Sequence, residues 1–197
     1  MPLQRTLVIK LGGGLITEYD QAAPVVLTER IFSLLKTLTL SSKFERTIVV
    51  HGTGSFGKPQ AVTFNYLNGV LAKKRWMTVQ SVRRELSVLK RSFDDWSAFL
   101  GLPTWRLSTS SHFRFDQLGT PTLVGSNVIH DVCAQGMMPV FSGDFVIGKN
   151  EEFGVFSSDL IVELLSSAFS PATAVFLLDE DGVRDPVDNR KRIELIE

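Results

Sequence analysis

Short apolar runs alternate with segments of helical periodicity along most of this chain. The apolar runs predict strands at residues 6–11, 46–50, 138–141 and 174–178. Between them, apolar residues recur every three or four positions, which predicts helices at residues 28–38, 79–100, 127–135 and 158–168. This alternation is typical of an α/β fold with a mainly parallel central sheet, and we expect one domain over residues 1–197.

Polar residues and turn signals bound these segments. Thr28 is the expected cap of the first helix, and either Ser157 or Ser158 is the expected cap of the last. The segment Phe145–Phe156, with Gly-Lys-Asn at its centre, predicts a β-hairpin. The stretch Trp105–Val124 has no helical period, so we expect a strand followed by a hairpin or a long loop.

Composition excludes several classes of protein. The chain has 197 residues, of which 44% are hydrophobic, enough to bury a core. Basic and acidic residues number 21 each, so no bulk charge attracts nucleic acid or an anionic membrane, and we expect neither partner. The single cysteine, Cys133, lies on an apolar helix face and is expected to be an inert buried thiol. With no signal-like start and no membrane-length apolar run, the predicted location is cytoplasmic.

Candidate chemistry lies where two of the predicted strands end. The second strand runs into Gly52, Gly54 and Gly57, and the first carries Lys10 near its end and runs into Gly12, Gly13 and Gly14. Glycines at a strand exit let the backbone approach a ligand closely, and free N–H groups at a following helix suit an anion. The C-terminal ends of parallel strands share one edge of a sheet, so both loops are expected to converge with Lys10 on a phosphate.

Five short motifs then follow one another in an order that covers nearly the whole chain. They are Lys10–Gly14, His51–Pro59, Pro139–Asp144, Ser157–Leu160 and Leu178–Val183. The first is a Lys-Leu-Gly-Gly loop, the second a His-Gly-x-Gly-Ser-Phe-Gly loop, and the third a Pro-Val-x-x-Gly-Asp strand end. In this order they make the chain resemble the amino acid kinase superfamily, and within it the isopentenyl phosphate kinases and the related fosfomycin kinases.

The resemblance implies a fold, a reaction and an assembly. The fold would be a three-layer αβα sandwich, and the protein a homodimer. The reaction would transfer the γ-phosphoryl group of ATP, with Mg²⁺, to a small phosphate monoester. Isopentenyl phosphate, giving isopentenyl diphosphate, is the expected acceptor. Relatives continue beyond the equivalent of Glu197 through a segment that closes over the nucleotide, so the last part of the nucleotide-binding lobe is expected to be absent.

The resemblance also implies roles for individual residues. The expected catalytic residues are Lys10, Asp159 and Lys58, with Asp159 orienting Lys10 rather than acting as a base. The expected ATP-binding residues are Lys10, Gly12, Gly13, Gly14, Gly54, Asp179, Asp181 and Gly182. The expected acceptor-binding residues are Thr53, Gly54, Ser55, Lys58, Gly143 and Asp144, and no metal-ligating cluster of side chains is expected.

Several positions depart from the pattern of these relatives. Lys58 stands where isopentenyl phosphate kinases carry a histidine, so Lys58→His is an informative substitution for acceptor choice. Relatives place a lysine soon after the first glycine loop, where this chain has Glu18-Tyr19-Asp20. Gly14 and Thr53 replace a usual serine and glycine. A second hypothesis is therefore a weak or inactive relative that binds a phosphate-bearing ligand.

The candidate residues have structural explanations as well. A solvated charge at a strand end is the structural alternative for Lys10, and a plain acid at a helix N-terminus is the alternative for Asp159. Asp179–Gly182 fits an ordinary Asp-Gly turn, and His51 is expected to be a structural histidine at a strand end.

Overall fold

The computed structural model describes residues 5–20, 23–39, 44–57, 70–71, 76–148, 153–180 and 182. Its centre is a five-stranded sheet in the order β12-β1-β4-β9-β6, with every neighbouring pair parallel. The strands are β1 (Thr6–Leu11), β4 (Arg46–His51), β6 (Thr104–Arg106), β9 (Met138–Ser142) and β12 (Thr173–Leu177). The α/β fold with a mainly parallel sheet is thereby confirmed.

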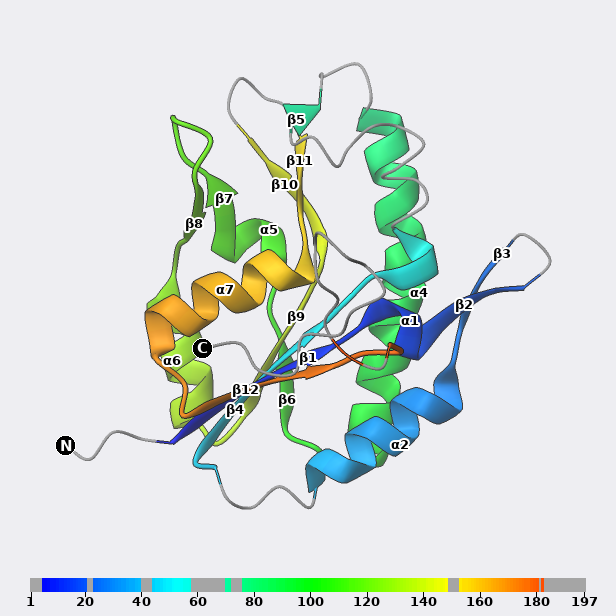
Figure 1. The fold of residues 1–197 in the computed structure, drawn as a ribbon, viewed down its shortest axis with the longest axis vertical. Coiled ribbons are helices and arrows are strands. Elements are labelled where there is room, and N and C mark those ends of the chain that lie inside the picture. The colour runs from blue at the N-terminus through cyan, green and yellow to red at the C-terminus, as the bar shows by residue number, and fades with distance from the viewer. Residues whose placement is uncertain are drawn as a thin grey trace.

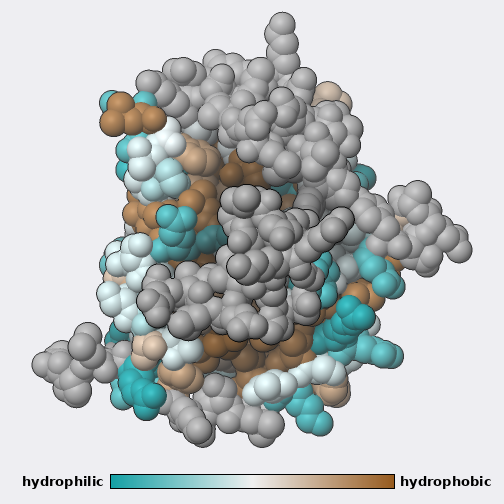
Figure 2. All heavy atoms as spheres, in the orientation of Figure 1, coloured by the Kyte–Doolittle hydropathy of each residue, from teal (hydrophilic) through white to brown (hydrophobic). Residues whose placement is uncertain are grey.

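Helices cover both faces of this sheet, which gives three layers (Figure 1). The helices α2 (Thr28–Thr39) and α4 (Trp76–Phe99) lie on one face, and α6 (Ser126–Ala134) and α7 (Ser158–Phe169) on the other. Alternate residues of β1 point to opposite faces, as the pleat requires, so Ile9 packs with α2 and α4 while Val8 packs with α6 and α7. Hydrophilic residues gather over the outer side of α2, typical of an amphipathic helix (Figure 2).

Antiparallel ribbons surround the central sheet. The predicted hairpin is confirmed as β10 (Asp144–Ile147) and β11 (Phe153–Phe156), with the short β5 (Val70–Leu71) paired to β11. The stretch after β6 contains one helical turn, α5 (Thr109–His112), and then the hairpin of β7 (Phe113–Phe115) and β8 (Pro121–Leu123). The predicted strand and hairpin are therefore confirmed there, while the helical turn is an addition.

Two details of the N-terminal half differ from the prediction. After β1 come the turn α1 (Gly13–Ile16) and an unexpected ribbon, β2 (Thr17–Asp20) with β3 (Ala23–Val26). Its polar residues and proline hide the alternation that marks a buried strand. Thr28 is the first residue of α2 rather than its cap, because the carbonyl of Leu27 accepts the N–H of Ile31. At α7 the predicted cap is confirmed, since Ser157 Oγ accepts the N–H of Leu160 at 3.1 Å.

The remaining sequence predictions concern burial. Cys133 is buried in α6, and burial raises the pKa of its thiol, as expected of an inert core cysteine. Within the described residues, no helix combines the length and the apolar composition that crossing a membrane requires.

Candidate active site

The two glycine loops contact each other at the carboxyl edge of the sheet. Because β1 and β4 are neighbours with Leu11 opposite His51, both chains leave the sheet side by side. A Cβ on Gly52 would lie 2.6 Å from the backbone nitrogen of Gly13, and a Cβ on Gly54 would lie 2.6 Å from the carbonyl oxygen of Gly13. The loops therefore need glycine for their mutual approach, and they form one surface.

Side chains from the next ribbon tie these loops together. Thr17 Oγ donates to the carbonyl of Gly13 at 2.9 Å and accepts the N–H of Ser55 at 2.9 Å. Ser55 Oγ donates to the carbonyl of Glu18 at 2.9 Å. The amide and hydroxyl of Ser55, expected to bind acceptor, are thus both engaged within the protein. The role of Thr17 has no local signal in the sequence, because it depends on Gly13 and Ser55 lying on either side of its hydroxyl.

Lys10 supplies the positive charge beside the loops. Its side chain is only 9% exposed, and Nζ lies 2.7 Å from Oδ1 of Asp159 in the first turn of α7. The same ammonium lies 5.8 Å from the ring centroid of Phe176 on β12. Lys10 and Asp159 meet because the Lys10 side chain points to the α7 face of the sheet, as the side chain of Val8, two residues earlier on the same strand, does.

Backbone N–H groups provide the other donors. Within the part of the chain that the structure describes, the amides of Gly13, Gly14, Thr53 and Gly54 donate to no protein acceptor. The amides of Gly12 and Gly143, both expected site residues, are instead engaged within the protein. The Gly12 N–H donates to Leu177 O at 2.8 Å and the Gly143 N–H to His51 O at 3.2 Å, so both amides belong to the sheet.

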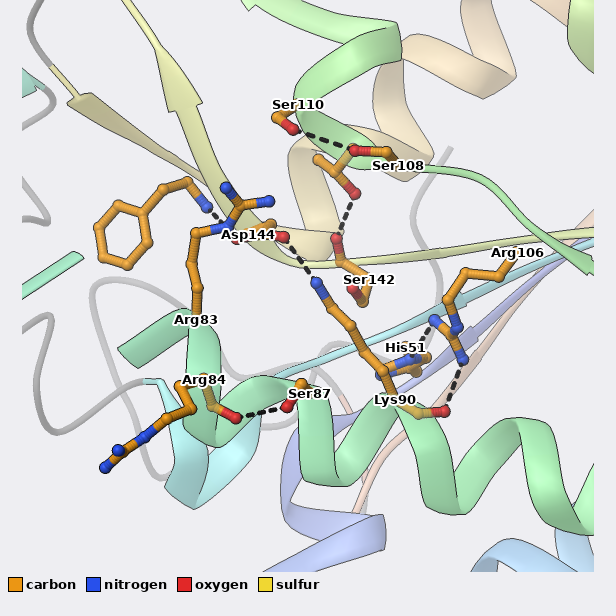
Figure 3. A network of polar contacts seen from close by, with 12 residues as sticks. His51, Arg83, Arg84, Ser87, Lys90, Arg106, Ser108, Ser110, Ser142 and Asp144 are labelled. Carbon is orange, nitrogen blue, oxygen red and sulfur yellow. Dashed lines mark hydrogen bonds and ion pairs between the residues drawn. The ribbon is translucent and has the colours of Figure 1, made fainter. Parts of the chain in front are cut away.

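Asp144 anchors the opposite side of the site (Figure 3). Its carboxylate is 2% exposed and lies 2.6 Å from Lys90 Nζ and 3.1 Å from Arg83 Nε, both on α4. It also accepts the N–H of Phe145 at 2.7 Å. A buried carboxylate needs such partners, so Asp144 links the start of β10 to α4. Sequence analysis missed both cations because only the apolar stripe of α4 was considered.

The glycine loops, Lys10 and Asp144 line one cleft of about 670 Å³. Of the expected site residues, the cleft includes Lys10, Gly12, Gly13, Gly14, Thr53, Gly54, Ser55, Gly143, Asp144, Asp159 and Asp179. Gly182 is described but does not line it, and Lys58 and Asp181 lie outside the described residues. Five apolar residues, together called the apolar wall, also line the cleft: Val82, Leu86, Phe145, Val155 and Phe156.

Acidic side chains also reach this cleft. Asp179 follows β12 and lies over the first loop, so that a Cβ on Gly14 would come within 2.6 Å of its Cγ. Glu18 and Glu180 line the cleft as well. The described residues contain no group of three or more His, Cys, Asp or Glu side chains placed to hold a metal ion. A Mg²⁺ ion with one carboxylate, phosphate oxygens and water still fits Asp179, because Mg²⁺ usually keeps several waters.

His51 is a buried residue behind the cleft. Its ring stacks on Phe93 with centroids 5.1 Å apart, and its Nδ1 lies 3.0 Å from Gly52 O. Burial, with the nearby Arg106 guanidinium, lowers its pKa from 6.5 to about 3. The ring is therefore neutral at physiological pH, and these contacts bear out the structural role expected of it.

This geometry is that of a small-molecule phosphotransferase: amides, a buried lysine and a cleft at the carboxyl edge of a parallel sheet. The chain belongs to the amino acid kinase family, whose model, described as "Amino acid kinase family", matches residues 5–197. Members of this family use ATP and transfer a phosphoryl group to phosphate or carboxylate acceptors.

Individual relatives are more specific. Over 188 residues the chain is 31% identical to an isopentenyl phosphate kinase of Thermoplasma acidophilum, covering 93% of this chain and 71% of that one. An isopentenyl phosphate kinase of Methanothermobacter thermautotrophicus is 27% identical, with 90% and 68% covered. Solved structures agree in fold: an isopentenyl phosphate kinase matches with a TM-score of 0.84 at 24% identity, covering 97% of this chain and 81% of that one. The T. acidophilum kinase in a product complex matches at 0.74 and 30% identity, covering 94% and 76%.

Proposed function

We propose that this protein transfers the γ-phosphoryl group of ATP to the phosphate of a short apolar alcohol phosphate, with isopentenyl phosphate as the acceptor and isopentenyl diphosphate as the product. One observation carries the proposal. A single cleft combines an oxyanion end, made by Lys10 and the glycine loops, with a wall of five apolar side chains. A prenyl chain suits that wall, and its phosphate suits the amides.

Phosphoryl transfer requires the protein mainly to position the two substrates and to stabilise the negative charge of the transition state. A phosphate monoester is largely ionised near neutral pH, since its second pKa is about 6, so the acceptor oxygen needs no general base. Lys10 would neutralise the charge that spreads over the transferred group, and the amides of Gly13, Gly14 and Gly54 would donate to its oxygens. Asp159 would hold Lys10 in place. Mg²⁺, held by nucleotide phosphates with Asp179, would offset further charge.

A second candidate is a catalytically weak or inactive member that binds a phosphate-bearing ligand. The observation that favours it is the charge of the cleft. Among the described lining residues Lys10 is the one cation, against Glu18, Asp144, Asp159, Asp179 and Glu180. The negative charge of Asp144 is neutralised by Lys90 and Arg83, but the negative charges of the other acids destabilise a highly charged transition state.

A coupled assay of ADP release separates these candidates. We expect acceptor-dependent ADP formation with isopentenyl phosphate, and much less with a glycerol phosphate, which carries the same charge on a polar chain. Binding of isopentenyl phosphate without turnover would support the second candidate. Equal turnover of both acceptors would contradict the assignment of the apolar wall.

The remaining expectations concern assembly. We propose that residues 1–197 act as one amino acid kinase-like domain, and that the protein is a cytoplasmic homodimer. Sedimentation of the purified protein tests the homodimer directly.

A further inference from the structure

A chain of polar contacts runs behind the cleft, from α4 through β6 to the loop after β4 (Figure 3). Arg106 Nε donates to both carboxylate oxygens of Asp94, at 2.8 and 2.9 Å, and Nη2 donates to Lys90 O at 3.1 Å. Its Nη1 lies 3.2 Å from Nε2 of His51, whose Nδ1 lies 3.0 Å from Gly52 O. The guanidinium is thus fixed on three sides.

The two partners of His51 determine which ring nitrogen carries the proton. A guanidinium only donates hydrogen bonds and a carbonyl oxygen only accepts them. Nε2 therefore accepts from Arg106, and Nδ1–H donates to Gly52 O. Because the ring is fully buried and stacked on Phe93, it holds this orientation. The depressed pKa agrees with a neutral ring.

This arrangement fixes a peptide group that borders the cleft. The C=O and N–H of a trans peptide point in opposite directions, and the described residues contain no cis bond. Holding Gly52 O therefore also sets the direction of the Thr53 N–H. Thr53 lines the cleft, and its N–H donates to no described protein group, so it is available to a ligand.

We propose that Arg106 and His51 are positioning residues for phosphate binding: they hold the 52–53 peptide so that the Thr53 N–H meets the phosphate of the acceptor. The identity of that acceptor rests on the proposed function, whereas capture of a phosphate by this amide does not. Lys90 supports this arrangement, because its carbonyl accepts from Arg106 while its ammonium group pairs with Asp144 at the start of β10. One residue of α4 thereby holds both Arg106 and the first residue of β10.

Titration with inorganic phosphate, followed at the Thr53 amide by ¹⁵N NMR, tests this inference without turnover. We expect a saturable shift in the wild type. His51→Asn keeps a donor at the position of Nδ1 and is expected to bind phosphate within about threefold of the wild type. His51→Leu keeps the volume but removes the donor, and should weaken binding at least about tenfold, the worth of one hydrogen bond to an anion. An unmoved Thr53 amide, or one dissociation constant for all three proteins, overturns the inference.

A second variant covers the case in which His51→Leu does not fold. Arg106→Met removes the donor to Nε2 at a half-buried site, so the ring is free to adopt the other tautomer, in which Nδ1 no longer donates to Gly52 O. We expect weaker phosphate binding than in the wild type at the same pH. Arg91→Met, an exposed arginine of α4, is the control and should leave binding unchanged. Unaltered affinity in Arg106→Met would contradict the inference.

Turnover in the same preparations separates this inference from the proposed function. A Thr53 shift with phosphate, but no ADP release with isopentenyl phosphate, leaves the inference standing and rejects the acceptor. Turnover with the same acceptor KM in His51→Leu as in the wild type rejects the inference alone.

Discussion

The ammonium group of Lys10 lies 2.7 Å from a carboxylate oxygen of Asp159, although one residue belongs to a sheet strand and the other to the first turn of α7. The lysine is nearly buried, with 9% of its side chain exposed, whereas the carboxylate is 66% exposed. Because the first turn of α7 supplies the partner of this ammonium group, the position of Lys10 in the cleft depends on where α7 begins.

Asp159→Asn tests this dependence. We expect kcat to fall by about 10- to 1,000-fold, because a misplaced cation stabilises the transferred phosphoryl group poorly, with a smaller change in the KM for ATP. Asp95→Asn is a matched control, since Asp95 is 70% exposed and pairs with Arg91 on the outer surface of α4. A kcat in Asp159→Asn equal to that of the control would show that the ion pair does not position Lys10.

Contact between the glycine loops gives a second prediction. Gly54 has a φ of +48°, and a Cβ there would lie 2.6 Å from Gly13 O. Gly136 has a φ of +74° with nothing within 4 Å of a Cβ. Both Gly→Ala variants bear the cost of a left-handed backbone, about 1 kcal/mol, but only Gly54→Ala also separates the loops. We expect loss of phosphate binding and turnover in Gly54→Ala alone, measured by calorimetry and ADP release. Similar activities in the two variants would mean that the loops need not touch.

The apolar wall of the cleft gives a third prediction. Leu86 lines the cleft and is 2% exposed, while Leu89, three residues along α4, is fully buried in the core away from it. Each Leu→Ala change should cost about 2–5 kcal/mol of stability. Only Leu86→Ala enlarges the cleft, so it should raise kcat/KM for longer prenyl phosphates relative to isopentenyl phosphate. An identical acceptor profile in both variants would place the acceptor chain elsewhere.

Much of this fold was predictable because its signals are local. Apolar runs such as Ile48–Val50 and the stripe from Val79 to Phe93 define buried strands and a helix without reference to the rest of the chain. The convergence of Lys10 with the glycine loops also followed, since carboxyl ends of parallel strands share an edge.

Other features depend on distant partners and left no local signal. The Thr17 hydroxyl matters only because Gly13 and Ser55 lie on either side of it. Arg83 and Lys90 look like ordinary polar positions of a helix until Asp144 is placed against them. The engagement of the Gly12 amide likewise depends on pairing with β12, which comes far later in the sequence.

The buried histidine predicts how stability varies with pH. The unfolded chain takes up a proton on His51 near pH 6.5, whereas the folded chain does so only near pH 3. This group's contribution is therefore complete above about pH 6.5 and is lost as the pH falls, by up to about 1.4 kcal/mol per pH unit. Urea unfolding between pH 7 and 4 should show a shallower decline for His51→Asn than for the wild type. Parallel pH profiles would indicate that His51 titrates normally in the folded state.

The most direct test of the central claim compares the wild type with Lys10→Ala in acceptor-dependent ADP release from ATP, with isopentenyl phosphate as the acceptor and Arg91→Ala as a surface control. The account predicts turnover in the wild type and in the control, and a fall of at least about 100-fold in Lys10→Ala. A rate that survives the loss of this ammonium group would contradict it.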